Sequence, residues 1–344
     1  MIWFLIFAAG LWGLGHLQKA PVSARLLMIA ILYLGVLLAM VILPQDNGLR
    51  QTLGGSFGEW SLLGGAAVVV WVYRKFLRAA RDKAQKTDSK DSPDLFDKAE
   101  LDRTARHIVL REIGGLGQKK LKEARVLVIG AGGLGSPVLQ YLTAAGVGTI
   151  GVVDDDVVDN SNLQRQIIHT DDRIGMPKVF SAELAMKAQN PFVVVRPYNR
   201  RLTETDARDL IAEYDLVLDG TDNFETRYLV NKVCVALKKP LIGAALSQWE
   251  GQVSTYDPAR DAPCYQCIFP QAPAADLAPT CAEAGVLGPL PGVVGSMMAA
   301  EAVKEITGAG EGLRGRMMIY DALYGENRTI AMKRRKDCPV CGAA

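Results

Sequence analysis

The chain has 344 residues, which is enough for more than one folded unit. With 39 basic and 37 acidic side chains, its formal net charge is only +2 at pH 7. The sequence also has no basic block interleaved with aromatic residues. These features exclude a protein that binds nucleic acid or another polyanion through a strongly basic surface.

Residues 1–80 are predicted to form a membrane anchor of about three transmembrane helices. The run from Leu26 to Leu43 has no charged or strongly polar side chain. As a helix rising about 1.5 Å per residue it would cover roughly 27 Å, close to the thickness of the hydrocarbon core. The runs Ile2 to Leu17 and Trp60 to Tyr73 are shorter. A cleaved signal peptide is disfavoured, because no basic residue precedes the first run.

Basic residues predict the orientation of this anchor. Lys19 and Arg25 separate the first two runs, whereas Arg50 is the one basic residue in the loop from Pro44 to Glu59. A basic cluster follows the third run: Arg74, Lys75, Arg78, Arg81 and Lys83. The positive-inside rule then predicts a multi-pass protein of the inner (cytoplasmic) membrane, with the rest of the chain in the cytoplasm. Residues 81–100 are rich in charged residues and Ser and are expected to form a linker.

From Ala124 the pattern becomes that of an α/β protein. The segment RVLVIGAGGLGSPVLQYLTAAGVGTIGVVD predicts a strand, a glycine turn, a helix and a second strand. Gly130, Gly132 and Gly135 satisfy G-x-G-x-x-G, and without Cβ atoms such a turn lets phosphate approach the helix N-terminus. Asp154 ends the second strand, where a carboxylate can accept hydrogen bonds from ribose hydroxyls. The sequence therefore predicts a Rossmann-like, doubly wound sheet that binds a nucleotide.

The glycine signature leaves the class of enzyme open, because its most common meaning is NAD or FAD binding by an oxidoreductase. Arg165 and Lys178 follow the ribose acid within one βα unit. Asp222 follows another apolar strand, and in open α/β sheets such strand ends face one crevice. Two cations and a carboxylate around a nucleotide favour magnesium-assisted attack on a phosphate over hydride transfer. A non-catalytic membrane scaffold that keeps the fold is a third interpretation.

Six cysteines occur, none of them before Cys234, which lies in a helical segment and is interpreted as a core residue. Two C-x-x-C motifs supply four thiolates, enough for a tetrahedral structural Zn²⁺ site: Cys264, Cys267, Cys338 and Cys341. Disulfides are the alternative for these four residues. Cys281 belongs to neither motif. A catalytic role for it stays open, since thiol reactivity depends on a local pKa that the sequence does not specify.

Residues 101–344 resemble the adenylation domain of the MoeB/ThiF/HesA adenylyltransferases, relatives of the ubiquitin-activating enzymes, and are most similar to MoeB. The resemblance rests on eight motifs in order: RHIVL, GAGGLG, DDD…SNLQRQ, GMPK, DGTDN, PCYQC, TCAEAGV and CPVC. It implies ATP-dependent adenylation of the C-terminal Gly-Gly carboxylate of a ubiquitin-fold sulfur-carrier protein, with release of pyrophosphate. The small subunit of molybdopterin synthase, in molybdenum cofactor biosynthesis, is the expected carrier. The thiamine thiazole carrier is the alternative.

The resemblance also implies roles for individual residues. Asp154 would bind the ribose of ATP, Asp222 would hold Mg²⁺, and Arg106 would reach the phosphates of a neighbouring subunit in a homodimer. The other nucleotide-binding residues would be those of the glycine turn and the phosphate contacts: Gly130, Gly132, Gly133, Gly135, Asn162, Arg165 and Lys178. The cysteine that Cys281 matches forms a covalent link to carrier or sulfur in some members and is dispensable in others. The sulfur donor is expected to be a separate protein.

Overall fold

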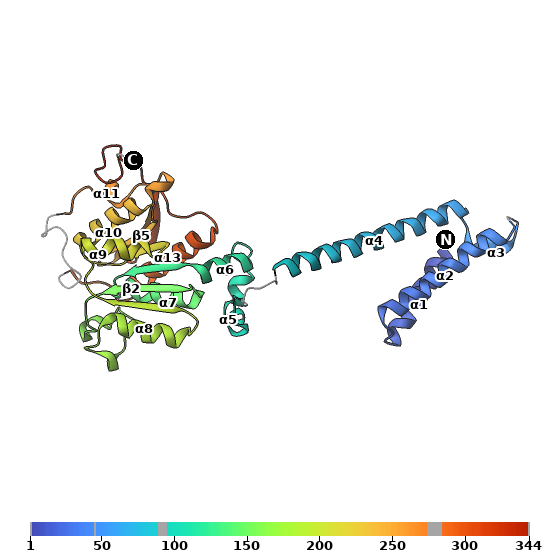
Figure 1. Cartoon of the computed structure of the whole chain (residues 1–344), viewed down its shortest axis with the longest axis horizontal. Helices are drawn as coiled ribbons and strands as arrows, with labels where there is room; N and C mark the ends of the chain where they lie inside the picture. Colours follow the sequence, from blue (N-terminus) through green and yellow to red (C-terminus); the bar gives the residue numbers. More distant parts are fainter. Residues whose placement is uncertain (1, 45, 89–94, 274–283, 343–344) are drawn as a thin grey trace. The chain divides into compact units, whose positions relative to one another are not determined.

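The computed structural model describes residues 2–44, 46–88, 95–273 and 284–342. The chain divides into two compact units, Met1–Pro93 and Asp94–Ala344 (Figure 1).

The first unit consists of helices with few buried side chains. Its small core joins Val36, Met40 and Trp60, while most of its large apolar side chains are exposed. The helices are α1 (Ile2–Leu17), α2 (Val22–Ile42), α3 (Gly48–Leu53) and α4 (Phe57–Asp88).

Among the described helices, α2 is the one that is long and apolar enough to cross a membrane. The apolar part of α1, Trp3–Leu17, is shorter than a span requires. The third predicted run lies inside α4, which has Glu59 in its first turn and continues into a charged sequence. The prediction of about three spans is therefore not supported, and the structure provides one candidate span.

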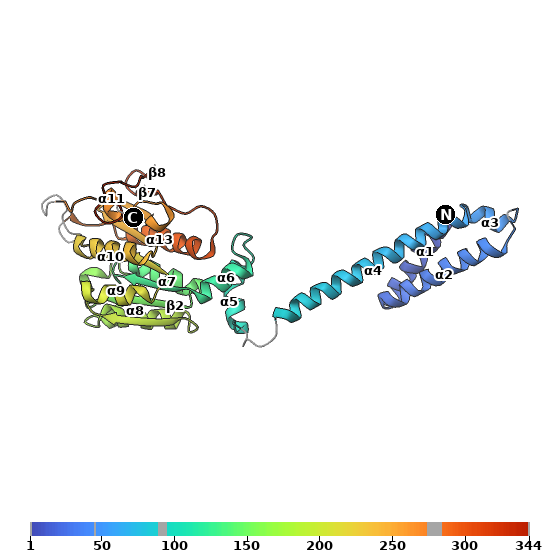
Figure 2. The same cartoon turned by 45° about the horizontal axis from the view of Figure 1, so that its top comes forward.

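The second unit is built on one eight-stranded sheet with the order β3-β2-β1-β4-β5-β6-β7-β8. Strands β1 to β5 pair in parallel, and β6, β7 and β8 extend the sheet in antiparallel fashion. Figure 2 shows β7 and β8 beside each other at the end of the sheet. The strands are β1 (Arg125–Ile129), β2 (Thr149–Asp154), β3 (Val194–Asn199), β4 (Leu216–Asp219), β5 (Leu241–Ser247), β6 (Glu250–Tyr256), β7 (Arg316–Asp321) and β8 (Glu326–Ala331).

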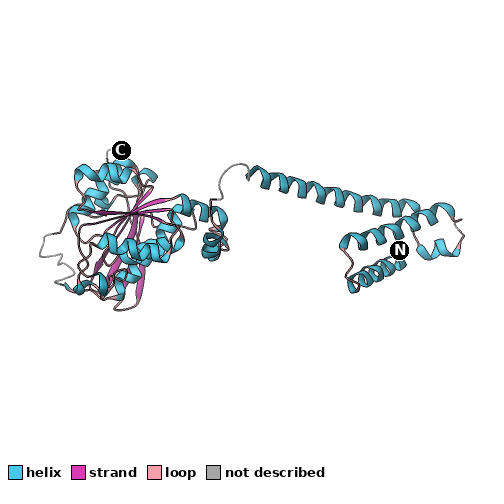
Figure 3. Cartoon of the chain, turned by 60° about the horizontal axis from the view of Figure 1, so that its bottom comes forward, coloured by secondary structure: helices cyan, strands magenta, loops and turns pink. Residues whose placement is uncertain are grey.

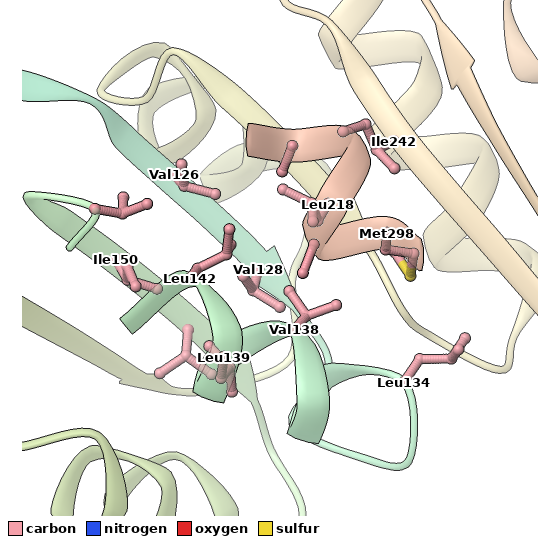
Figure 4. Packing of buried hydrophobic residues seen from close by; sticks show 14 of the residues in the cluster. Val126, Val128, Leu134, Val138, Leu139, Leu142, Ile150, Leu218, Ile242 and Met298 are labelled. Atoms are coloured by element: carbon pink, nitrogen blue, oxygen red, sulfur yellow. The ribbon is translucent and has the colours of Figure 1, made fainter. Parts of the chain in front are cut away.

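Helices cover both faces of this sheet, because successive strand side chains point to opposite faces. Val126 and Val128 pack in one core with Leu139 of α7, as Figure 4 shows, and Leu127 and Ile129 belong to a second core with α9 and α10. Figure 3 shows the strands between the helices. The helices are α5 (Lys98–Ile108), α6 (Gly114–Glu123), α7 (Gly135–Ala145), α8 (Lys178–Gln189), α9 (Glu204–Ala212), α10 (Phe224–Leu237), α11 (Tyr265–Ile268) and α13 (Pro289–Thr307).

The α/β prediction is thus confirmed for the parallel half of the sheet, including its strand–turn–helix–strand start. The order β3-β2-β1-β4-β5 matches five of the six strands of the doubly wound arrangement. The antiparallel extension had no counterpart in the sequence analysis. The local sequence pattern does not show which strand each of β6, β7 and β8 pairs with, because these pairings depend on the tertiary structure.

The start of β2 depends on close approach of two main-chain segments at Gly148. The N–H of Gly148 donates to the Leu121 carbonyl at 3.0 Å, and its carbonyl accepts from the Val194 N–H at 2.9 Å. A Cβ at residue 148 would collide with the backbone carbonyl of Lys122. A backbone carbonyl, unlike a side chain, cannot avoid the added methyl group by changing its rotamer. Residue 148 must therefore be glycine.

We expect Gly148→Ala to lower the free energy of unfolding of the second unit by about 1–3 kcal/mol, because the added methyl overpacks a fixed backbone contact. Gly115→Ala is the matched control, since a Cβ at residue 115 meets nothing within 4 Å. Its site is helical, where alanine is favoured over glycine. Denaturant unfolding followed by circular dichroism measures both variants. Equal stability of the two would contradict the steric explanation.

Candidate functional site

The turn between β1 and α7 is formed almost entirely by main chain. Gly130 has a φ of +93°, and its N–H donates to the Val153 carbonyl at 2.8 Å. A Cβ on Gly135 would collide with the Gly130 carbonyl, and one on Gly133 would lie 3.1 Å from Pro291 Cβ. The side chain of Leu134, which precedes α7, makes no capping bond. The start of α7 therefore has main-chain donors for an anion at the carboxyl edge of the sheet.

Asp154 is fixed over this turn from the end of β2. Its carboxylate accepts the Ala131 N–H at 2.7 Å and the Asp156 N–H at 2.9 Å. Burial raises the pKa of Asp154 above its usual range, although the charge of Lys178 and the two N–H donors work in the opposite direction. The carboxylate is therefore held at the glycine turn by bonds to the turn itself.

The segment DNSNLQRQIIHT lies against the same turn. Asn162 ends a short 3₁₀ helix, Asn160–Asn162, and its side-chain oxygen accepts from Arg165 Nη2 at 2.7 Å. Arg165 Cγ lies 3.8 Å from the position that a Cβ on Gly133 would occupy. The structure thus brings Asn162 and Arg165 together beside the glycines.

Lys178 reaches this site from the first position of α8. Its side chain is buried, and its Nζ forms an ion pair with Asp156 Oδ2 at 2.6 Å. The Lys178 N–H donates to the Asp156 carbonyl at 2.9 Å. Because the Lys178 charge also acts on Asp154, the two side chains are neighbours in one electrostatic environment.

Asp222 lies in the loop after β4, at the point where the strand order reverses between β1 and β4. A Cβ on Gly130 would lie 3.2 Å from the Gly220 carbonyl, so this loop contacts the glycine turn directly. The exposed Asp222 follows the buried Asp219, whose carboxylate accepts from the Thr221 N–H at 2.9 Å and hydroxyl at 2.6 Å.

Arg106 is not part of this arrangement within one chain. It lies exposed in the last turn of α5, and Arg103 of that helix donates to the Gln189 carbonyl at 2.7 Å. Gln189 ends α8, and Thr104 contacts Gly146 at the end of α7. The C-terminal ends of α7 and α8 lead into the first residues of β2 and β3, so they lie at the amino edge of the parallel strands. Because α5 contacts these helix ends, it lies at that edge, opposite the glycine turn. Cys281 lies outside the described residues.

The four cysteines of the C-x-x-C motifs form one buried cluster. The Sγ atom of Cys264 lies 3.9 Å from Cys267 Sγ and 3.6 Å from Cys338 Sγ. The Sγ atoms of Cys267 and Cys341 are 3.3 Å apart. None of them is in a disulfide. Four sulfurs around one Zn²⁺ at about 2.3 Å each would be about 3.8 Å apart, so the donor set fits a tetrahedral site.

The electrostatic surroundings of these thiols differ. Burial raises the pKa of Cys264 and of Cys267. For Cys338 burial acts in the same direction, but the backbone N–H groups of Cys341 and Val340 and the hydrogen bonds with Cys264 and Cys267 together outweigh it and lower the pKa to about 7. Cys234 is buried in the second core, as its helical segment predicted, and burial raises its pKa.

Three further polar residues of the site were missed by sequence reasoning. Asp156 pairs with Lys178, and the amide oxygen of the buried Gln166 has no hydrogen-bond partner among the described residues. Arg227 is buried and donates to the carbonyls of Thr221 and Ala244, which holds the Asp222 loop. An arginine within the mostly apolar helix sequence FETRYLVNKVCVAL was the one local signal for this role.

Comparison with known proteins identifies the family. The ThiF family matches residues 104–340. The chain is 49% identical over 249 residues to a sulfur carrier protein adenylyltransferase of Thermus thermophilus, covering 71% of this chain and 92% of the relative. It is 48% identical over 247 residues to the SAMP-activating enzyme E1 of Haloferax volcanii, covering 72% and 91%.

Solved structures support the same assignment. Escherichia coli MccB with AMPCPP and MccA is 26% identical, with a TM-score of 0.58 over 66% of this chain and 69% of that chain. The eight motifs noted in the sequence lie in the region that the family matches, except for Cys341, the last residue of CPVC. The structure gathers the glycine, acidic and basic residues of GAGGLG, DDD…SNLQRQ, GMPK and DGTDN at one sheet edge. The chain belongs to the ThiF family of MoeB-like adenylyltransferases.

Proposed function

We propose that the second unit adenylates the C-terminal Gly-Gly carboxylate of a ubiquitin-fold sulfur-carrier protein with ATP. The observation that carries this function is the convergence of Asp154, Arg165 and Lys178 on the glycine turn. The names of the Thermus and Haloferax relatives, which include a sulfur carrier protein adenylyltransferase, support it.

The reaction needs alignment and charge compensation more than a protein nucleophile. A carboxylate oxygen of the carrier attacks the α-phosphorus of ATP, the bond from that phosphorus to the bridging oxygen breaks, and pyrophosphate leaves. Asp154 would accept hydrogen bonds from the ribose. Arg165 and Lys178, with the main-chain N–H groups at the start of α7, would offset negative charge on the phosphates.

Asp222 fits the role of a Mg²⁺ ligand, because it is an exposed acidic residue in the loop that contacts the glycine turn and Mg²⁺ prefers oxygen ligands. The ion would supply further positive charge to the departing pyrophosphate. Arg227 would support this role indirectly, since it holds the carbonyl of Thr221 next to Asp222.

The carrier that we propose is the small subunit of molybdopterin synthase, with the thiamine thiazole carrier as the second candidate. A separate protein would donate the sulfur. A homodimer accounts for Arg106, which in its own subunit lies at the opposite edge of the sheet from the nucleotide site.

A membrane location is also part of the proposal. The helix α2 would span the inner membrane, and the many exposed apolar side chains of α1 and α4 would contact lipid. Lys75 stacks on Trp71 with its Nζ 4.8 Å from the ring centroid, a pair suited to the membrane interface. With α2 as the span, the five basic residues between positions 74 and 83 outnumber Lys19 and Arg25 on its other side, and this excess would keep the following catalytic unit in the cytoplasm.

We propose that the cysteine cluster binds one structural Zn²⁺. The metal would join the segment around α11 to residues near the end of the chain, because Cys264 and Cys338 are 74 positions apart. The same ligands leave no open position for a catalytic water.

Arg165→Ala is expected to reduce carrier-dependent exchange of labelled pyrophosphate into ATP by about 100-fold or more, because one cation at the phosphates is lost. Arg328→Ala is the control, since Arg328 forms a surface ion pair with Glu250 on the antiparallel part of the sheet. Exchange by the unaltered chain would also separate this function from an oxidoreductase and from a non-catalytic scaffold. Undiminished exchange in Arg165→Ala would refute the assigned role.

Purified protein is expected to contain about one zinc per chain, as a closed four-cysteine site requires. Cys338→Ala should lose the metal and lower the melting temperature, whereas Cys234→Ala removes a buried thiol of the second core and should keep it. Elemental analysis and thermal unfolding measure the two effects. Equal zinc content in both variants would contradict the proposed ligand set.

Leu34→Arg is expected to move the chain from the membrane fraction toward the soluble or aggregated fraction, because a central arginine costs about 2.5–3.5 kcal/mol on insertion. Leu34 is 62% exposed on α2, so little packing within the protein is lost. Leu95→Arg, at an exposed leucine outside the anchor, is the control. Carbonate-resistant sedimentation with membranes measures the effect, and indistinguishable variants would argue against α2 as a span.

A further inference from the structure

The lysine assigned to the phosphates is already paired in the structure. Lys178 Nζ lies 2.6 Å from Asp156 Oδ2, and in the described parts of the chain this is the one carboxylate within ion-pair distance of it. The Lys178 side chain is 6% exposed, whereas that of Asp156 is 67% exposed. A buried ammonium is costly without a partner, so Asp156 satisfies a charge that the interior would otherwise disfavour.

Asp156 is also fixed through its main chain. Its N–H donates to Asp154 Oδ1 at 2.9 Å, and its carbonyl accepts from the Lys178 N–H at 2.9 Å. Asp156 is therefore tied to the proposed ribose acid on one side and to the proposed phosphate lysine on the other. Its main chain is held on both sides, and its carboxylate is held by the ion pair with Lys178.

This geometry creates a competition when a triphosphate binds. The phosphate oxygens must either take the Lys178 ammonium from Asp156 or share it, and the Asp156 carboxylate repels them at short range. We propose that Asp156 is a positioning residue that holds the Lys178 ammonium at the glycine turn in the free enzyme and yields it to the triphosphate of ATP.

The inference rests on the proposed function, since it assumes that Lys178 binds phosphate. It involves an exchange of ionic partners, and no covalent bond changes. Its consequence is that Asp156 weakens nucleotide binding relative to what the lysine alone would allow. In return it holds the buried ammonium in place while the site is free.

The chain contains a matched control for this role. Asp155 is the preceding residue, carries the same charge and is exposed, and no described residue forms an ion pair with it. Asp155→Asn and Asp156→Asn therefore remove the same charge from adjacent positions, but one of them removes the partner of Lys178. In Asp156→Asn the amide oxygen can still accept a hydrogen bond from the lysine.

Binding of MgATP to the full-length chain, without carrier, is measured by titration calorimetry. We expect the Kd of Asp156→Asn to be about two- to fivefold lower than that of Asp155→Asn, the range of a partly exposed ion pair. In a Lys178→Gln background the difference between the two asparagine variants should disappear, because the competition needs the ammonium.

Equal affinities of the two asparagine variants would overturn the role of Asp156. Weaker binding by Asp156→Asn together with a reduced dependence on Mg²⁺ would also overturn it, since Asp156 would then act as a metal ligand. Absence of ATP binding by the unaltered chain would instead refute the proposed function itself. The two failures are thus distinguishable in one set of titrations.

Discussion

The nucleotide site depends on a steric constraint in the turn after β1. The Gly130 carbonyl occupies the space that a side chain at residue 135 would need, and the Gly220 carbonyl approaches Gly130 from the neighbouring strand. Main chain of β1, β4 and α7 can meet there only because the Cβ atoms are missing. The helix N-terminus therefore opens into the crevice between β1 and β4, where the strand order reverses.

Charges of both signs are arranged around that turn before any ligand binds. Asp154 is bonded to the turn itself, and Asp156 holds Lys178. Such preorganisation reduces the rearrangement that the protein must make when charge develops on the phosphates. It also has a cost, because buried charges need partners of opposite sign, and those partners compete with the substrate. In this site the balance between Lys178 and Asp156 decides how much of the lysine charge a nucleotide receives.

The antiparallel strands β6 to β8 and the cysteine cluster position the C-terminal part of the described chain. Strands β6 to β8 leave the exposed β8 at the edge, and the residues after it return to the body of the protein. The sulfurs of Cys338 and Cys341 meet those of Cys264 and Cys267 beside Val235 of α10. A metal bound to these thiolates would stabilise the end of the chain more effectively than the few apolar contacts available there.

The sequence by itself determined the features whose physical cause is local. The strand, the glycine turn and the acid at the end of the next strand follow from residues within one βα unit, and the C-x-x-C spacing indicates a thiolate site. The membrane prediction was less accurate, because apolar runs were judged separately. The third run belongs to the long helix Phe57–Asp88, which has Glu59 in its first turn, and α2 alone meets the length and composition of a span among the described helices.

Only the tertiary structure decided which distant residues meet. The pair Lys178–Asp156 joins positions 22 residues apart, and Arg227 reaches the carbonyl of Ala244 from α10. Arg106 lies at the edge of the sheet opposite the glycine turn of its own chain, whereas its motif associates it with the phosphates of a neighbouring subunit. Contacts of this kind depend on strand order and on the direction in which each helix returns. Neither is encoded in the spacing of residues along the chain.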